Sequence, residues 1–501
     1  MLLKKLISEV EVINQVGDLD LDITNIHSDS RKIKEGGLFI AINGFTKNGI
    51  EFIPSAIENG AKALIVEPDV DLNSLNLPEN ITAVSVKNTR KALAQTACEF
   101  YDNPSKKLKL IGVTGTKGKT TSTFMIKSIL EAHGLNVGLI GSIAVYINGE
   151  KIEDTDRTTP ESIEIQKHLA NMVEKDVDVA IIEVSSQAMK LERVTGCEFD
   201  VSLFTNLTED HISPKEHPSM EDYFNCKLQL IKNSKYGVIN NDDETVMKIK
   251  ELLPNKNLKT FSIDNNSDFK VNPDTVVITN SYIDFSILFN GKEEQIEASI
   301  PGKFSIYNAA GAIAVSSYFD ITADDIRTAL KDLRVLGRSE LVPNKLGLTI
   351  LIDYAHTPSS LESILNAVNT YAKGKVICAW GVGGDRDAAK RPVMGEISGR
   401  LADFTVLISD QVRTEDPLKI LKEIEVGIIP TGKPYKIIVD RTEGIKYAIS
   451  IATPGDIIVI PGLGHDLYLE KNGIKHPYDE RKVIAKLIDE MIESGERKPI
   501  N

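Results

Sequence analysis

Short apolar runs alternate with amphipathic stretches along most of this chain. The short runs predict buried strands, and the longer stretches, with apolar residues three or four positions apart, predict helices. Strands that alternate with helices indicate an α/β fold with a mostly parallel sheet covered on both faces. We expect strands at residues 38–42, 63–66, 108–113, 137–140, 177–182, 201–205, 237–239, 348–353, 375–380, 405–408, 436–439 and 456–460, and helices at 52–59, 119–133, 305–319 and 479–494.

The same pattern divides the chain into three segments. Residues 1–104 mix short strands and helices and end in a cluster of turn formers around Pro104, which disfavours helix before it. Residues 105–336 follow the alternating pattern and become β-rich and antiparallel in character over 268–299. Residues 337–501 repeat the alternation, which predicts a second doubly wound unit. We therefore expect three domains with these boundaries.

Composition narrows the class of protein. The 501 residues carry 58 Lys and Arg against 72 Asp and Glu, a formal charge of −14, which disfavours nucleic acid and anionic membranes as partners. No apolar run is long enough for a membrane span, and the first ten residues lack the pattern of a signal peptide. The four scattered cysteines form no CxxC pair, so we expect neither disulfides nor a thiolate zinc site. We expect a cytoplasmic protein.

The most specific motif is the stretch GVTGTKGKTT at residues 112–121, between a predicted strand and a predicted helix. Glycines let the backbone approach phosphate oxygens, and the helix N-terminus supplies free N–H groups. Lys119 would reach the β- and γ-phosphates of a nucleotide, and the Thr120 hydroxyl would bind magnesium. The strict phosphate-loop pattern has glycine where this chain has Val113. A plain glycine-rich turn is the alternative, but Gly-Lys-Thr-Thr at such a junction rarely arises by chance.

Two further residues are candidate magnesium ligands. Glu183 ends a predicted buried strand, and an acid at the carboxyl end of a parallel strand faces the crevice where ligands bind. The alternative is a solvated charge at a strand end. His211 follows another strand end. From the residues alone, such a histidine is more often a hydrogen-bonded loop residue than a ligand.

Several motifs together resemble a known family. The loop over residues 114–120 resembles that of the Mur ligases, ATP-dependent enzymes that add amino acids in peptidoglycan synthesis. Six further stretches, in order along the whole chain, are similar to the tripeptide synthetases (MurE) of that family. They are Asp29-Ser30-Arg31, Thr158-Thr159-Pro160, Glu183-Val184-Ser185-Ser186, Asp353-Tyr354-Ala355-His356-Thr357-Pro358, Gly383-Gly384-Asp385-Arg386-Asp387 and Lys390-Arg391-Pro392.

The resemblance implies a fold and a reaction. It implies a mixed α/β domain for a UDP-sugar, a central phosphate-loop ATPase domain and a C-terminal Rossmann-like domain that binds the amino acid. It implies that a substrate carboxylate attacks the γ-phosphate of ATP to give an acyl phosphate, which an amine then converts to an amide. Two anions must meet in such a step, so cations and magnesium are expected at the site.

The resemblance also implies roles for individual residues. It assigns ATP to Thr114, Gly115, Thr116, Lys117, Gly118, Lys119, Thr120, Asn308, Arg338 and Asp353. It assigns the UDP-muramoyl dipeptide to Ser30, Phe45, Thr46, Lys47, Arg157, Thr158, Thr159, Ser185 and Arg193. It assigns magnesium to Thr120, Glu183, His211 and a carbamylated Lys227, and catalysis to Lys119, His211 and Lys227. Without the resemblance, Lys227 would be interpreted as an ordinary lysine on a helix surface.

The amino-acid pocket departs most from the family. The family motif Asp-Asn-Pro-Arg is here Asp410-Gln411-Val412-Arg413, and Gly-Lys-Gly-His-Glu is here the stretch from Gly462 to Asp466. The guanidinium of Arg413 suits a carboxylate and would repel the ammonium of lysine. We therefore favour meso-diaminopimelate as the added amino acid. The residues predicted to bind it are Arg391, Asp410, Gln411, Val412, Arg413, Gly462 and Asp466.

Alternatives stay open at this point. Arg413 could instead pair with Glu415 or Asp416 at a helix start. The ligase could use L-lysine or another amino acid, be a paralogue with a changed acceptor, or be a folylpolyglutamate or polyglutamate ligase. The Asp29-Ser30-Arg31 stretch favours a UDP-sugar domain, which the folate enzymes lack at that end. A non-catalytic nucleotide-binding regulator is disfavoured because the phosphate and metal residues are all present. We expect a monomer.

Overall fold

The structure, a computed structural model, describes residues 1–44, 47–210, 212–213 and 216–499. The chain forms two compact units. The first comprises Met1–Lys270 and Ala310–Asp325, and the second comprises Val271–Ala309 and Ile326–Asn501.

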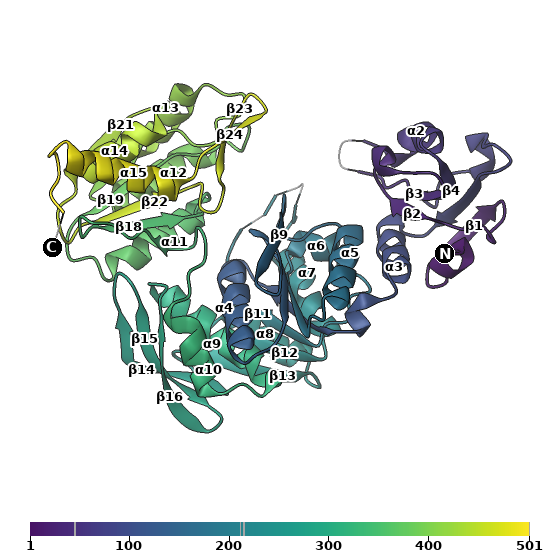
Figure 1. The fold of residues 1–501 in the computed structure, drawn as a ribbon, viewed down its shortest axis with the longest axis horizontal. Coiled ribbons are helices and arrows are strands. Elements are labelled where there is room, and N and C mark those ends of the chain that lie inside the picture. The colour runs from purple at the N-terminus through teal and green to yellow at the C-terminus, as the bar shows by residue number, and fades with distance from the viewer. Residues whose placement is uncertain (45–46, 211, 214–215, 500–501) are drawn as a thin grey trace. The chain divides into compact units, whose positions relative to one another are not determined.

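The first unit begins with a five-stranded sheet in the order β1-β5-β4-β3-β2 (Figure 1). Its strands are β1 (Val12–Val16), β2 (Asn25–His27), β3 (Gly37–Ile40), β4 (Ala61–Val66) and β5 (Thr82–Val86). All neighbours are parallel except β1 and β5. Helices α1 (Leu3–Leu6) and α3 (Thr89–Phe100) pack on one face of the sheet, and α2 (Ile53–Glu58) packs on the other.

The same unit also contains eight strands of an eleven-stranded sheet, in the order β13-β12-β11-β6-β10-β7-β8-β9, and β14, β15 and β16 continue that sheet beyond β13. Its strands are β6 (Lys109–Thr114), β7 (Val137–Ile140), β8 (Ala144–Ile147), β9 (Glu150–Asp154), β10 (Val179–Glu183), β11 (Val201–Phe204), β12 (Tyr236–Asn240) and β13 (Asn257–Ser262). The strands from β13 to β7 are parallel, whereas β8 and β9 extend the edge as an antiparallel hairpin. The carboxyl ends of β6, β10 and β11 therefore lie side by side.

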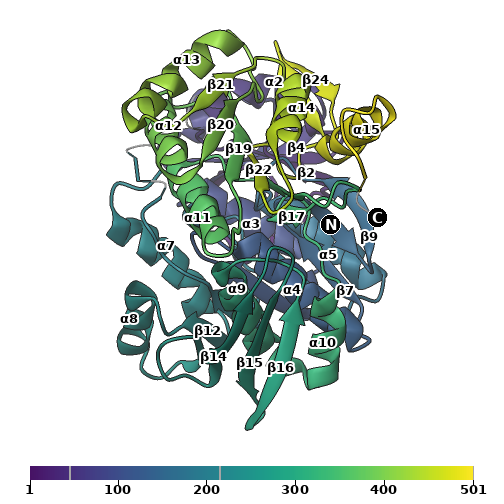
Figure 2. The same cartoon turned by 90° about the vertical axis from the view of Figure 1, so that its left-hand side faces the viewer.

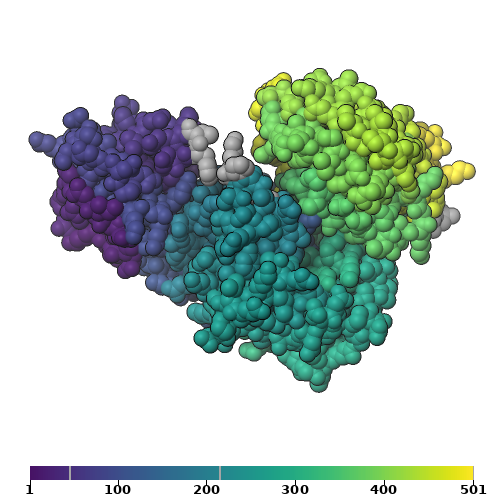
Figure 3. Space-filling model, turned by 180° about the vertical axis from the view of Figure 1, so that it is seen from behind, coloured from purple at the N-terminus to yellow at the C-terminus, as the bar shows by residue number. Residues whose placement is uncertain are grey.

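Helices cover this sheet because their apolar faces match its buried strands. Leu110, Ala180 and Ile182 pack against α5, while Phe204 and Ile239 pack against α7 and α8. Figure 3 shows the molecule from behind, where the teal segments around α7 and α8 face the viewer. The helices are α4 (Lys119–Ala132), α5 (Ser162–Glu174), α6 (Ser186–Lys190), α7 (Met220–Asn233) and α8 (Glu244–Leu252). None of the described helices is long and apolar enough to cross a membrane.

The second unit contains a six-stranded sheet in the order β17-β18-β22-β19-β20-β21. Its strands are β17 (Glu340–Leu341), β18 (Thr349–Asp353), β19 (Val376–Trp380), β20 (Phe404–Leu407), β21 (Tyr435–Ile437) and β22 (Ile457–Pro461), of which only β17 is antiparallel to its neighbour. An antiparallel meander of β14 (Phe269–Ile278), β15 (Ile283–Phe289) and β16 (Lys292–Ala298) precedes it, and a hairpin of β23 (Tyr468–Lys471) and β24 (Ile474–Pro477) follows it.

Helices lie on both faces of the six-stranded sheet, as a doubly wound unit requires. Helices α11 (Pro358–Asn369), α12 (Lys390–Leu401) and α13 (Pro417–Ile428) pack on one face, and α14 (Arg441–Ile451) and α15 (Glu480–Glu493) pack on the other (Figure 2). Helices α9 (Lys303–Ser316) and α10 (Ala323–Lys331) contribute residues to both units. Short 3-10 turns are η1 (Ser30–Lys32), η2 (Gly49–Phe52), η3 (Leu72–Leu75), η4 (Pro104–Lys106), η5 (Ser317–Phe319) and η6 (Ile429–Thr431).

The predicted α/β class, the alternating strands and the antiparallel stretch over 268–299 are confirmed. The sequence prediction lacked the exposed strand β1, the hairpin of β8 and β9, the hairpin of β23 and β24, and the strands β2, β5, β13 and β17. The two units of the fold do not test the domain boundaries at 104/105 and 336/337, which stay predictions.

Candidate active site

The glycine-rich stretch forms the turn between β6 and α4, as predicted. Gly115 has a φ of +147°, and a Cβ atom at this position would lie 1.9 Å from Oγ1 of Thr205. Only glycine fits such a close approach in this conformation. Gly118, with a φ of +84°, precedes the first residue of α4, Lys119. The loop therefore presents the N-terminus of a helix next to a closely approached backbone, the arrangement that binds phosphate.

A neighbouring strand end clamps this loop. Thr205 Oγ1 donates to the carbonyl of Lys117 (2.7 Å), and Asn206 Oδ1 accepts from the Lys117 N–H (3.0 Å). The Thr116 N–H donates to the Asn206 carbonyl (2.9 Å). Sequence reasoning missed Thr205 and Asn206 as site residues. Their position along the chain could have indicated them, because they directly follow strand β11, just as Glu183 ends strand β10.

Two lysines converge on one carbonyl of the loop. Lys119 Nζ donates to the Gly115 carbonyl (2.9 Å), and Lys227 Nζ, from α7, donates to the same oxygen (2.8 Å). Lys227 is only 1% exposed. Burial, and then the nearby charge of Lys119, hold the pKa of Lys227 well below its usual range. The interpretation of Lys227 as a surface lysine is therefore wrong.

Glu183 is a fully buried carboxylate. Its oxygens accept from Thr120 Oγ1 (3.0 Å), from Ser142 Oγ (3.0 Å) and from the Ser142 N–H (3.0 Å). Within the described part of the chain it has no cationic partner. A buried carboxylate without a cation is costly, and hard oxygen donors are what magnesium prefers. Glu183 and Thr120 therefore fit a magnesium ion. The alternative of a solvated strand-end charge is wrong.

The residues assigned to the dipeptide gather beside Glu183. Thr158 Oγ1 lies within hydrogen-bond distance of Ser142 Oγ (3.1 Å), and Thr159 Oγ1 donates to the Glu183 carbonyl (2.8 Å) while accepting from the Ser185 N–H (3.0 Å). Arg193 donates to the Thr159 carbonyl (3.1 Å). These side chains form one polar network with the metal candidates.

Two arginines share one acid at the edge of this network. Arg157 and Arg193 both pair with Glu161 (2.7 and 2.9 Å), the N-cap residue of α5. Burial lowers the pKa of Arg193, whereas the contact with Asp156 raises that of Arg157. Glu161 was also missed from the sequence, although it directly follows the Thr-Thr-Pro motif.

The other residues assigned to the UDP part lie in the N-terminal sheet region. Ser30 is buried, and its carbonyl accepts from Asn59 Nδ2 (3.0 Å). The ammonium of Lys47 lies 5.6 Å from the ring centroid of Phe52. Neither takes part in the network around Glu183. Three predicted site residues, Phe45, Thr46 and His211, lie outside the described residues.

The remaining nucleotide candidates belong to the second unit. Asn308 is buried in α9. The Asp353 carboxylate accepts from the N–H groups of Ser339 (2.8 Å) and Ala355 (2.9 Å), and burial raises its pKa although Arg338 opposes that shift. The guanidinium of Arg338 lies 4.9 Å from the ring centroid of Tyr354. Arg338 and Asp353 thus lie together at the end of β18.

Most residues predicted for the amino acid also lie together. Gln411 Nε2 donates to Asp466 Oδ2 (2.7 Å), and the Gln411 N–H donates to Asp410 Oδ1 (2.6 Å). Gly462 has a φ of +127°, and a Cβ there would lie 2.5 Å from Asp410 Oδ2. Burial raises the pKa of Asp466, and the charge of Asp410 adds to the shift. Val412 instead packs in the core. The buried Asp410 and the half-buried Asp466 therefore both accept from Gln411, one from its backbone N–H and the other from its side-chain amide.

Arg413 is held by different partners from those expected at a helix start. Its guanidinium donates to the Gly384 carbonyl (2.7 Å) and pairs with Glu470 (3.3 Å), which lies on β23. Its φ is +50°, and its backbone bonds to Glu470 and Asn472. The alternative pairing with Glu415 or Asp416 is wrong.

Arg391 is almost completely buried and bonded on both terminal nitrogens. It pairs with Glu415 (2.7 Å) and Glu423 (2.6 Å). Glu415 in turn accepts from the Asp385 N–H (2.6 Å). Arg391 thus supports the loop at Asp385. Its predicted contact with an amino acid stays untested.

Comparison with known proteins follows the same order along the chain. Three family descriptions match: "Mur ligase family, catalytic domain" over residues 22–101, "Mur ligase middle domain" over 113–316 and "Mur ligase, glutamate ligase domain" over 337–464. The chain is 44% identical over 495 residues to a Clostridium tetani protein named UDP-N-acetylmuramoyl-L-alanyl-D-glutamate--2,6-diaminopimelate ligase, covering 98% of this chain and 100% of that protein. The chain belongs to the Mur ligase family.

Further comparisons agree with this assignment. A Clostridium botulinum Mur ligase of the same name is 43% identical over 475 residues, 94% of this chain and 96% of its own length. A solved structure titled as the 2,6-diaminopimelate ligase matches with a TM-score of 0.69 and 26% identity, over 98% of this chain and 99% of that chain. The three-domain Mur ligase fold expected from the sequence motifs is therefore confirmed.

Proposed function

We propose that this Mur ligase uses ATP to join meso-diaminopimelate to UDP-N-acetylmuramoyl-L-alanyl-D-glutamate, in peptidoglycan synthesis. The observation that carries the proposal is the near-complete match, at 44% identity, to a relative with this activity in its name. Under the proposal, the free carboxylate of the substrate attacks the γ-phosphate of ATP, and ADP leaves. The amine then displaces phosphate from the acyl phosphate, which gives the amide.

The phosphate loop of this chain supports the first step. Lys119 lies at the start of α4, where its ammonium can reach the β- and γ-phosphates, and the loop N–H groups are held in place by Asn206. We assign magnesium to Glu183 and Thr120, with His211 as a further ligand. When bound, magnesium neutralises charge on the phosphates and the attacking carboxylate. Thr159 and Ser185, in the same network as Glu183, would orient the dipeptide.

Lys227 suits carbamylation. Only the neutral amine can attack carbon dioxide, and the lowered pKa of Lys227 enlarges the neutral fraction near pH 8. Nitrogen bonds to the carbon of carbon dioxide, one N–H proton leaves, and an ammonium site becomes a carbamate anion. We propose that this anion supports a second magnesium at the site. It would also remove one of the two positive charges that meet at the Gly115 carbonyl.

The amino-acid group supports a substrate with a distal carboxylate. The guanidinium of Arg413 would bind that carboxylate, while Asp410 and Asp466 would bind the ammonium groups. Glu470 now holds Arg413 at 3.3 Å, so the substrate carboxylate must compete with Glu470. Arg391 acts indirectly under this proposal, because Glu415 and Glu423 occupy its guanidinium.

Other acceptors are less consistent with the N-terminal region. The match to the family description over residues 22–101, together with Ser30 and Lys47, favours a UDP-sugar over a folate or polyglutamate acceptor. We propose that the enzyme works as a monomer in the cytoplasm, where ATP is available, without nucleic acid or membrane partners. Its net charge of −14 is consistent with that proposal.

Amino-acid selectivity tests the proposal directly. Phosphate release from ATP should require the UDP-muramoyl dipeptide, and kcat/KM should favour diaminopimelate over L-lysine by at least about tenfold, about 1.4 kcal/mol. Arg413→Ala should bring the two values close together, whereas Lys433→Ala, at an exposed position, should not. A wild-type enzyme that prefers lysine, or an unchanged ratio in Arg413→Ala, would overturn this assignment.

A further inference from the structure

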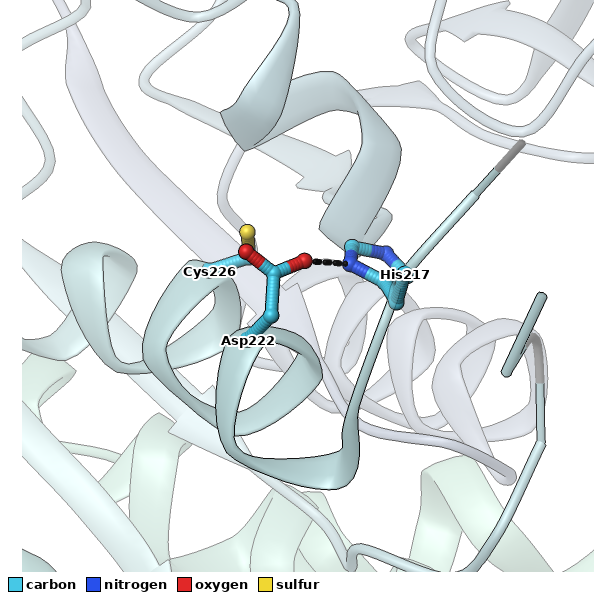
Figure 4. Close-up of side chains that lie close together, drawn as sticks. All are labelled: His217, Asp222 and Cys226. Carbon is cyan, nitrogen blue, oxygen red and sulfur yellow. Dashed lines mark hydrogen bonds and ion pairs between the residues drawn. The ribbon is translucent and has the colours of Figure 1, made fainter. Parts of the chain in front are cut away.

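A buried histidine lies outside the set of residues assigned above. His217 is 1% exposed and precedes α7. Its Nδ1 lies 2.7 Å from Asp222 Oδ2, and its Nε2 lies 2.9 Å from Ser186 Oγ (Figure 4 shows the first contact). A carboxylate can only accept, so Nδ1 carries the proton, and in the neutral ring Nε2 accepts from the Ser186 hydroxyl.

These contacts belong to a hydrogen-bond network that connects two helices. Ser186 and Lys190 lie one turn apart on α6, and Asp222 lies on α7. Lys190 Nζ donates to Asp222 Oδ2 (3.1 Å) and to the Glu216 carbonyl (2.9 Å). This network therefore joins α6 to the first turn of α7 through four side chains, those of Ser186, His217, Asp222 and Lys190, and one backbone carbonyl, that of Glu216.

Each of the two helices carries candidate site residues next to this hydrogen-bond network. On α6, Ser185 caps the helix and directly precedes Ser186, two residues after Glu183. On α7, Tyr223 follows Asp222, donates to Thr116 Oγ1 (3.3 Å) and contacts the ring of His217, with 5.0 Å between ring centroids. Lys227 lies one turn further along the same helix. His217 thus connects the predicted dipeptide residues to the phosphate-loop residues.

We propose that His217 is a positioning residue of this ligase, which sets Ser185 through Ser186 and sets Tyr223 and Lys227 through Asp222. The proposal rests on the proposed function for the identity of the substrates. The two imidazole nitrogens of His217 have different roles. Loss of the Nε2 contact frees the start of α6 and weakens binding of the UDP-muramoyl dipeptide. Loss of the Nδ1 contact frees the first turn of α7 and slows the phosphoryl transfer step.

A metal site is the competing interpretation of the same cluster. His217, Asp222 and Cys226 offer ligand atoms within 4.8 Å of one another. However, the ammonium of Lys190 lies 3.1 Å from the Asp222 oxygen that a cation would need, and both ring nitrogens of His217 already have partners. The charge of the Asp222 carboxylate is thus balanced by Lys190 without a metal ion. This favours the hydrogen-bond network over a metal site.

Two conservative variants distinguish the role of Nδ1 from the role of Nε2. In His217→Asn the amide nitrogen replaces Nδ1 and keeps Asp222, whereas in His217→Gln the amide oxygen replaces Nε2 and keeps Ser186. We expect His217→Asn and Ser186→Ala to raise KM for the UDP-muramoyl dipeptide about tenfold, as loss of one hydrogen bond can do, with kcat within about threefold. We expect His217→Gln to lower kcat about tenfold with KM within about threefold.

Matched controls sharpen the test. His133→Asn makes the same change at another His–Asp pair of this unit, at 2.9 Å from Asp325, and should leave KM and kcat unchanged. Cys226→Ser removes one possible metal ligand and should also have no effect. If Cys226→Ser matches His217→Asn, or if KM and kcat change together in both His217 variants, the positioning role is wrong.

Hydrogen exchange provides a readout that needs no turnover. Amides of α6 should exchange faster in His217→Asn and in Ser186→Ala than in the wild type, and those of the first turn of α7 should exchange faster in His217→Gln. Unchanged exchange in all three variants would overturn the proposal. A wild-type enzyme that makes no product from these substrates refutes the proposed function instead, and the exchange data then decide on His217.

Discussion

At the scale of single residues, the two lysines at the phosphate loop have the same carbonyl partner but different surroundings. Lys119 begins α4, where a nucleotide phosphate can replace its contacts with the loop carbonyls. Lys227, on α7, is buried, and this burial holds its pKa well below the usual range. The first lysine is placed to contact a nucleotide phosphate, and the second is suited to react as a neutral amine.

Removal of the charge at Lys119 should abolish turnover. In Lys119→Ala the phosphates lose their cationic partner at the start of α4, so kcat should fall by well over tenfold, more than about 1.4 kcal/mol in the barrier. Phosphate release measures this. Lys127→Ala, which removes an ammonium paired with Glu131 on the same helix, is the control and should stay active. Residual activity above about a tenth of wild type would refute the phosphate-loop assignment.

Lys227→Ala should be inactive but partly restored by short carboxylates. If a carbamate supplies an anion at this position, acetate or formate can enter the space left by the side chain and replace that charge. The measurement is turnover at increasing carboxylate concentration, with chloride at equal ionic strength for comparison. Lys232→Ala, on the exposed side of α7, should behave as wild type. Full activity of Lys227→Ala without additives would remove this residue from the mechanism.

The sequence predicted Lys119 more securely than Lys227 for a physical reason. The loop around Lys119 is a local structure whose glycines and helix start are adjacent along the chain. Lys227 reaches Gly115 across 112 residues of sequence, a distance that no local pattern encodes. One signal existed, because Lys227 lies four residues after Tyr223 on the face of α7 that also buries Leu230. A lysine on an apolar helix face predicts burial.

At the scale of elements, the antiparallel hairpins include strands that the pattern of apolar residues alone does not predict. The turns between β8 and β9, between β15 and β16 and between β23 and β24 each contain an Asn-Gly pair in which both residues have positive φ. Such pairs are a strong hairpin signal. The strands β9 and β24 are mostly exposed, so they lack the apolar runs by which the parallel strands were predicted. Turn chemistry would have found them.

The contact of Arg391 with Glu415 should stabilise the second unit above the acid range. This contact holds the pKa of Glu415 at about 2, below its usual value of 4.5. A lowered folded-state pKa gives stability that is present above pH 4.5 and is lost as the pH falls toward 2. Glu415→Gln should therefore cost about 1–3 kcal/mol at pH 7, as expected for a hydrogen bond to a charged group, and less at pH 3.

Denaturant unfolding of wild type and Glu415→Gln from pH 7 to pH 3 measures that difference. Glu396→Gln breaks an exposed ion pair with Arg400 on the same helix, α12, and should cost less than about 1 kcal/mol at every pH. A Glu415→Gln penalty that stays constant down to pH 3 would contradict the role of the ionised carboxylate.

At the scale of the whole molecule, most residues assigned to phosphoryl transfer and those assigned to the amino acid belong to different units, although the nucleotide candidates Asn308, Arg338 and Asp353 lie in the second unit. The phosphate loop, the magnesium candidates and the dipeptide candidates Thr158, Thr159 and Ser185 all belong to the first unit. The amino-acid candidates from Asp410 to Asp466 all belong to the second. This division was predictable, because each set of motifs occupies its own stretch of sequence. It also means that a variant in one set should spare the chemistry assigned to the other.

Trapping of the acyl phosphate tests that separation. With ATP, the UDP-muramoyl dipeptide and hydroxylamine but no amino acid, the wild type should form a hydroxamate, since hydroxylamine displaces phosphate from the acyl phosphate. Arg413→Ala should keep this reaction within about threefold while its amide formation with diaminopimelate falls at least about tenfold. Lys119→Ala should lose both reactions, because the γ-phosphate is never transferred. If Arg413→Ala loses hydroxamate formation to the same extent as amide formation, the amino-acid residues act on the first step as well and the chemistry is not divided between the units.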